Sequence, residues 1–158
     1  MGSKQSITFR ELAETHMKAF LIYVNAKRAN DMISAMEAES ILELNVNQCK
    51  CELNKRIPGA GLVIGSRFMA SMKAELLLLD NPTAAITELQ SCHESMVTAL
   101  NMVFGQKEKW KSLWALQLQT MINYLIDSSQ QNNDLCVQSA SSLGNAFDLL
   151  VGSKINRE

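Results

Sequence analysis

The chain has 158 residues, of which 47% are hydrophobic and 20% are charged, and its formal net charge is −1. A chain of this length is expected to form one domain with a substantial core, and the composition excludes an intrinsically disordered protein. The nearly balanced charge argues against a dedicated nucleic-acid-binding protein, which would normally be strongly basic.

Apolar runs and cysteines indicate the compartment. We expect no secretory leader, because the first apolar cluster begins only at Phe20 and is followed by Lys27 and Arg28. No apolar run approaches the roughly 20 residues that a membrane span requires. The four cysteines show no spacing typical of a disulfide framework, so we expect reduced thiols and a cytoplasmic protein.

The first half of the chain has helical spacing. Thr8 and Glu11 form a capping box that predicts the start of the first helix. Residues 9–55 contain neither proline nor glycine, but a single helix of that length would be about 70 Å long. Because a domain of this size is much shorter, we expect a break near residues 25–31, with Asn30 capping a second helix.

Glycine and proline bound the next elements. A Gly-rich connection over residues 57–65 is expected to lead into a third helix over residues 66–79. Asn81 and Pro82 are typical of an N-cap and a first helical position, so they predict the start of a fourth helix. Gly105 is the kind of residue that ends a helix.

Two further helices complete the chain. A fifth helix carries both tryptophans, and a polar loop over residues 128–133 is expected to precede a sixth helix that Asp134 caps. Residues 1–7 are expected to form a flexible N-terminus and residues 153–158 a frayed C-terminus. The sequence therefore predicts an all-α, single-domain bundle of five or six helices.

The glycines of residues 59–65 superficially resemble a dinucleotide-binding loop. A Rossmann fingerprint follows a strand and has the spacing G-x-G-x-x-G, whereas a helix precedes this segment and the spacing is one residue too long. No other catalytic grouping has a local signature. We therefore expect neither enzymatic activity nor a cofactor.

Cysteine and histidine provide few metal ligands. The set that comes nearest to a zinc site is Cys49, Cys51, Cys92 and His93. Residues two apart on a helix point about 200° away from each other, so Cys49 and Cys51 would share a metal only if the helix unwound. We expect no metal site and interpret the thiols as small hydrophobic groups. His16 and His93 lie on apolar stripes, where a histidine is usually a hydrogen-bonded core residue.

Lysines surround Trp110 near the start of the fifth helix. Three positive charges there oppose the helix dipole, which indicates a bound anion or an acidic partner. The alternative is a solvated helix face. A second basic cluster lies near the end of the second helix. The candidate phosphate, anion or partner contacts are Lys50, Lys55, Arg56, Lys107, Lys109 and Lys111.

Two short apolar segments indicate association. Leu62, Val63 and Ile64 fill the Gly-rich connection, and Leu77 and Leu78 belong to a segment that is apolar all round. This exceeds what one small bundle needs to bury, so we expect these residues to form a partner face and the chain to form a dimer or higher oligomer.

The chain begins with a pattern that N-myristoyl transferase recognises, in which Gly2 is followed by Ser6. In these two residues it resembles the myristoylated matrix proteins of retroviruses. That resemblance implies a lipid anchor on Gly2 in a small helical bundle. The alternative is an expression tag or a chance match.

Three functions are compatible with these patterns. The first is a non-catalytic helical interaction or adaptor module that self-associates and binds a protein partner. The second is a peripheral, matrix-like membrane protein with an acylated Gly2 and a basic surface that faces anionic lipid or nucleic acid. The third is a helical bundle that senses a small molecule.

Overall fold

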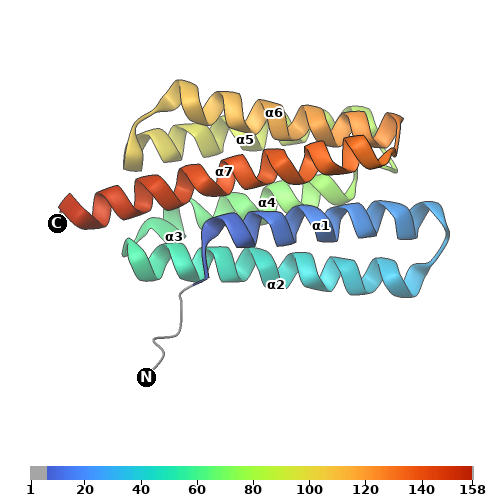
Figure 1. Cartoon of the computed structure of the whole chain (residues 1–158), viewed down its shortest axis with the longest axis horizontal. Coiled ribbons are helices and arrows are strands. Elements are labelled where there is room, and N and C mark those ends of the chain that lie inside the picture. Colours follow the sequence, from blue (N-terminus) through green and yellow to red (C-terminus); the bar gives the residue numbers. More distant parts are fainter. Residues whose placement is uncertain (1–6, 158) are drawn as a thin grey trace.

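Helices account for most of the chain in the computed structural model, which describes residues 7–157 (Figure 1). Six of the helices have 12 residues or more, and the remaining one, α3, has four. No strand occurs among the described residues, so the predicted all-α bundle is confirmed. The helices are α1 (Phe9–Arg28), α2 (Met32–Arg56), α3 (Ala60–Val63), α4 (Gly65–Leu76), α5 (Pro82–Phe104), α6 (Lys107–Ile126) and α7 (Gln130–Arg157).

The bundle consists of two helical hairpins with two helices between them. Figure 1 shows α1 and α2 along one side, α5 and α6 along the other, and α4 and α7 in the middle. Helix α7 packs against α1 and α6, and α4 packs against α2 and α5. Residues from five helices can therefore meet in the interior. None of the helices in the described part is both long and apolar enough to cross a membrane.

The ends of α1 follow side-chain capping chemistry. The Thr8 hydroxyl accepts a hydrogen bond from the Glu11 N–H at 3.1 Å, which confirms the predicted cap. At the predicted break, the assignment of Asn30 as the second cap is wrong. Asn30 has a φ of 57° and takes the left-handed turn after α1, a conformation that asparagine tolerates. Asp31 caps α2 instead, accepting from the Ser34 N–H at 3.1 Å.

The Gly-rich segment is more ordered than a plain connection. It contains α3, and α4 begins within it at Gly65 and ends at Leu76, earlier than expected. A Cβ on Gly61 would lie 2.6 Å from the Asn54 Cβ, and one on Gly65 would lie 2.3 Å from the Lys50 Cγ. These two glycines therefore allow α3 and α4 to pack closely against α2.

Helix α5 has the predicted ends. The Asn81 side chain accepts from the Ala84 N–H at 3.4 Å, Pro82 occupies the first turn, and Gly105 follows the helix with a φ of 72°. This agreement arises because all three signals are local: a cap, a residue without an N–H, and a residue free to adopt positive φ.

Helix α7 corrects two expectations. It begins at Gln130, inside the expected polar loop, where the Ser129 hydroxyl accepts from the Asn132 N–H at 3.2 Å. Asp134 therefore lies within the helix and does not cap it. The helix also continues past Gly152 to Arg157, where a frayed end was expected. Of the expected flexible N-terminus, residues 1–6 lie outside the described residues.

The core has two main hydrophobic clusters. One includes Phe20, Leu42 and Met121, and the other includes Trp110 and Phe147. The partly buried side chain of Phe68, on α4, packs against both. Several polar side chains are buried in the same interior, including those of Asn45, Ser71, Glu75 and Gln117.

Candidate functional site: a polar cavity inside the bundle

A cavity of about 80 Å³ lies where the two clusters meet, and five helices line it. Helix α1 contributes His16 and Phe9, α2 contributes Asn45, α4 contributes Glu75, α6 contributes Trp114, and α7 contributes Phe147. An interior cavity with an apolar wall and a few converging polar groups is typical of small-molecule sites.

A buried ion pair forms one side of the cavity. The His16 Nε2 lies 2.8 Å from the Glu75 Oε2, and the His16 Nδ1 lies 3.0 Å from the Asn45 Oδ1. The Asn45 amide nitrogen donates to the Leu12 carbonyl oxygen at 2.8 Å. That bond orients the Asn45 amide with its oxygen toward His16, so the Nδ1 of His16 carries a proton and donates it.

The electrostatics of His16 follow from these contacts. Burial lowers the pKa of His16, but the negative charge of Glu75 and the hydrogen bonds that His16 donates to Glu75 and Asn45 outweigh burial. The pKa of His16 is therefore raised above its ordinary value. When His16 is protonated, its positive charge lies beside the carboxylate of Glu75 and the two charges compensate each other.

Three buried polar atoms around the same cavity have no hydrogen-bond partner. They are the Ser71 Oγ, the Trp114 Nε1 and the Gln117 Oε1, and they are the full set of such side-chain atoms in the described part of the chain. All three residues line the cavity and are at most 6% exposed. An unpaired buried polar group costs about 1–3 kcal/mol, and the three residues that carry these atoms all border the same cavity.

Trp114 is held in position by His93, which does not line the cavity. Its ring stacks on that of His93, with centroids 4.9 Å apart and an interplanar angle of 29°. Burial lowers the pKa of His93, while the charge of Glu75 opposes that effect. A neutral His93 can therefore stack on the indole and fix the direction of its N–H.

Aromatic rings form the apolar wall. The ring centroid of Phe147 lies 5.6 Å from that of Phe9 and 6.1 Å from that of Phe68. Gly144 lets α7 approach this wall, because a Cβ there would lie 2.4 Å from the Cα of Arg10. Cys49 also lines the cavity, and burial raises the pKa of its thiol to about 12, so the wall stays uncharged at this position.

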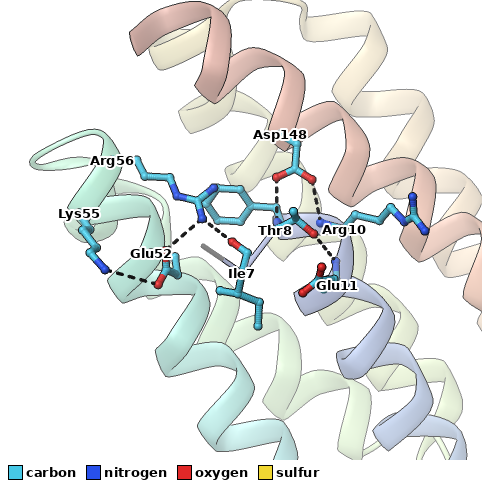
Figure 2. A network of polar contacts seen from close by, with 9 residues as sticks. Ile7, Thr8, Arg10, Glu11, Glu52, Lys55, Arg56 and Asp148 are labelled. Carbon is cyan, nitrogen blue, oxygen red and sulfur yellow. Dashed lines mark hydrogen bonds and ion pairs between the residues drawn. The ribbon is translucent and has the colours of Figure 1, made fainter. Parts of the chain in front are cut away.

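A polar network fixes Phe9 at the end of the wall (Figure 2). The Asp148 carboxylate accepts from the backbone N–H groups of Phe9 and Arg10 at 2.8 and 3.1 Å, and thus caps α1 from α7. The Arg56 guanidinium donates to the Ile7 carbonyl and to Glu52, and it lies 4.8 Å from the centre of the Phe9 ring. Arg56 is therefore engaged within the chain, and its contact with an external anion or partner stays a prediction.

The hydroxyl, the histidine and the glutamate of the cavity do not make the contacts of a catalytic triad. Ser71 is a hydroxyl near a histidine and a glutamate, but both ring nitrogens of His16 already contact Asn45 and Glu75. Neither nitrogen is free to accept a proton from the Ser71 hydroxyl, which a catalytic triad requires.

The zinc candidates do not come together. Cys49 lines the cavity, Cys51 is exposed, Cys92 is buried on α5, and His93 stacks on Trp114. Among the described residues, no group of three or more histidine, cysteine, aspartate or glutamate side chains is placed to hold a metal ion.

The basic candidates lie on the surface, away from the cavity wall. Lys107, Lys109 and Lys111 are exposed on the first turn of α6. Lys55 is exposed with its Nζ 4.0 Å from Glu52, and Lys50 is half-buried beside Gly65. Their contact with an anion or partner stays a prediction.

The expected apolar partner face is only partly exposed. Ile64 and Leu78 are buried in the core, so their assignment to that face is wrong. Leu62, Val63 and Leu77 are exposed. The reason is geometric, since α3 and the turn after α4 each present one side of their apolar run to the bundle. Gly2 lies outside the described residues, and its acylation stays a prediction.

Sequence reasoning had singled out His16 but not its partners. Asn45 had a detectable signal, because it continues the inward stripe of Ala38 and Leu42 on α2. Glu75, Ser71 and Gln117 had none, since their burial depends on which helices flank them.

Comparisons with known proteins give no relative from which a role could be transferred. No family model matches the chain, and neither curated proteins nor solved structures gave a match. The arrangement of the cavity is therefore the basis for a functional assignment.

Proposed function

We propose that the bundle binds a small, uncharged molecule in its interior cavity and acts as a sensing module. The observation that carries this proposal is that Ser71, Trp114 and Gln117, the residues with unpaired buried polar atoms in the described part of the chain, all line one cavity. A ligand that satisfies them would remove an energetic cost that the empty fold bears, so binding would stabilise the folded state.

The unpaired atoms define the hydrogen bonds that the ligand makes. The Trp114 N–H requires an acceptor, the Gln117 oxygen requires a donor, and the Ser71 hydroxyl can act as either. The ligand therefore carries a donor and an acceptor close together. A primary amide has this pattern, with a carbonyl for Trp114 and an N–H for Gln117.

The charge of the site favours a neutral ligand. His16 and Glu75 form a compensated pair at 2.8 Å, so an added charge would be buried without a counter-ion. Burying such a charge is much more costly than burying a neutral polar group. Carboxylate and ammonium analogues of the ligand are therefore expected to be rejected.

The volume limits the size of the ligand. A cavity of about 150 Å³ accommodates benzene, and a water molecule takes about 30 Å³ of liquid volume. The volume of about 80 Å³ therefore suits either two or three waters or one molecule of about four non-hydrogen atoms. A short amide such as acetamide meets the size, the charge and the hydrogen-bonding requirements.

The two tryptophans supply an internal control for the test. The Trp110 Nε1 donates to the Gly105 carbonyl at 2.9 Å, whereas the Trp114 Nε1 is unpaired. In a titration with acetamide followed by ¹H–¹⁵N NMR, we expect the Trp114 indole signal to move and that of Trp110 to stay. Acetate and methylammonium should move neither signal.

A matched pair of variants identifies the site. Gln117→Leu removes the acceptor inside the cavity, and Gln119→Leu makes the same change on the exposed side of α6. We expect the acetamide response of Trp114 to disappear in the first variant and to persist in the second. A Trp114 signal that no probe moves would leave water as the sole occupant and contradict the proposal.

A further inference from the structure

Helix α2 has a second apolar face, which points away from the bundle. Its large hydrophobic side chains are between 43% and 74% exposed. They are Met32, Ile33, Met36, Ile41 and Leu44. The inward face is separate and carries Ala38, Leu42, Val46 and Leu53, which are buried. We propose that the outward face of α2 binds a basic amphipathic helix of a partner protein.

The spacing fits a helical partner. Ile33, Met36 and Leu44 lie at intervals of three and eight residues, with Ile41 beside them, and so form a stripe along one side of α2. The stripe is about 17 Å long at 1.5 Å per residue, or about three turns. Helix-in-groove complexes use anchors at this kind of repeat.

The charges around the stripe are all negative. Glu37 lies among the apolar residues, Glu43 borders them beside Met36, and Glu39 lies further round the helix. Residues 29–49 contain no lysine or arginine. Within the described part of the chain these three carboxylates form no ion pair. An apolar stripe with carboxylates that form no ion pair within it and at its edge complements a helix with leucine-like anchors and neighbouring lysines or arginines.

The same charges argue against a second copy of α2 as the occupant. A two-fold axis that sets Ile33 against Leu44 would bring Glu37 of one copy close to Glu37 of the other, near the centre of the contact. Like charges placed opposite each other across an interface cost several kcal/mol. The expected self-association would therefore use another surface, and this face takes a basic partner.

The experiment uses designed peptide probes and the full chain. The probe is a synthetic 18-residue helix with leucines on one face and lysines on the flanks. The comparison peptides replace lysine by glutamate, or scramble the sequence so that the leucines no longer share a face. We expect fluorescence anisotropy to give an affinity for the lysine probe at least about tenfold higher than for either comparison peptide.

Matched variants locate the contact. Leu44→Ser should weaken binding of the lysine probe about tenfold or more, whereas Leu116→Ser, at a position 50% exposed on α6, should not. Glu37→Gln with Glu43→Gln should weaken binding and reduce its dependence on salt.

Three outcomes would overturn the proposal. Equal affinity for the lysine and scrambled probes would show that binding depends on the charge of the peptide and not on a shared leucine face. An unchanged affinity of Leu44→Ser would place the contact elsewhere. A sedimentation mass of twice 17.6 kDa that Leu44→Ser halves would make a second copy the occupant. This proposal does not depend on a ligand in the cavity. Either the partner-helix proposal or the cavity proposal can therefore fail without the other.

Discussion

Trp110 and Trp114 lie one turn apart on α6, yet their indole N–H groups meet opposite environments. Trp110 is fully buried, packs against Phe104 and Phe147, and donates to the Gly105 carbonyl at 2.9 Å. Trp114 is almost as buried but faces the cavity, and its N–H has no partner in the protein. The first N–H is paired within the chain, whereas the second is left as a donor that a molecule from outside could use.

The two regions of the core differ in whether their buried polar groups are paired. At Trp110 the indole N–H is paired with the Gly105 carbonyl. Burial of this side chain therefore stabilises the fold without the cost of an unpaired polar group. Around Trp114 three polar atoms remain unpaired beside an ion pair. Natural proteins often retain such costs where a site must bind something. Four predictions test this contrast.

The largest effect is expected from Glu75→Ala. The change removes the carboxylate that pairs with His16, so the imidazole either keeps a charge without a counter-ion or gives up its proton and leaves its Nε2 without a partner. Breaking a buried ion pair in this way destabilises a protein by about 3–5 kcal/mol. Urea-induced unfolding would measure the loss. Glu43→Ala, on the exposed side of α2, should change stability by no more than about 0.5 kcal/mol. A loss below about 1 kcal/mol in Glu75→Ala would contradict the role of the pair.

The second prediction compares the two tryptophans directly. Trp110→Phe removes packed volume and a satisfied hydrogen bond, so we expect a loss of about 2–3 kcal/mol. Trp114→Phe also removes volume, but it eliminates an unpaired N–H, so the loss should be about 1 kcal/mol or less. Thermal and chemical unfolding of both variants would check the difference. Equal losses would mean that the Trp114 N–H is satisfied in solution.

Local signals predicted the fold well because capping is decided within a few residues. Thr8, Asn81 and Gly105 each ended or began a helix as their chemistry requires. The capping pattern predicted the wrong start for α7, where two residues are able to cap the helix. Ser129 and Asp134 can both cap α7, and the choice of Ser129 depends on how the first turn of the helix packs.

The cavity was predictable only in part, since it joins distant positions. His16 was recognised because it lies on the apolar stripe of α1. Its partner Glu75 is 59 residues away, in a segment that was interpreted through its leucines. No local pattern decides which polar residue of an amphipathic helix faces inward when neighbouring helices cover more than one side. Ser71 and Gln117 were missed for the same reason.

The third prediction is a substitution in the core that raises the free energy of unfolding, whereas most core substitutions lower it. Gln117→Leu replaces an unpaired amide by an apolar side chain of similar size, so the ligand-free protein should gain about 1 kcal/mol. The acetamide response of Trp114 should be lost in the same variant. Gln119→Leu, on the exposed side of α6, should change neither quantity by much. A Gln117→Leu variant less stable than the parent would indicate that ordered water already satisfies the amide.

The smallest effect concerns pH. Glu75 is the charged neighbour that raises the pKa of His16. This raised pKa gives stability that is fully present below the unfolded pKa of about 6.5. That stability is lost as pH rises through the higher folded pKa.

The lowered pKa of His93 acts in the opposite direction. The unfolded form of His93 binds a proton first as pH falls, so stability decreases as pH drops below about 6.5. The parent should therefore show a shallow profile between these limits. His16→Gln should leave only the loss at low pH, and His93→Gln only the loss at high pH, in unfolding measured across that range. Identical profiles for the two variants would contradict the assignment of opposite shifts to the two histidines.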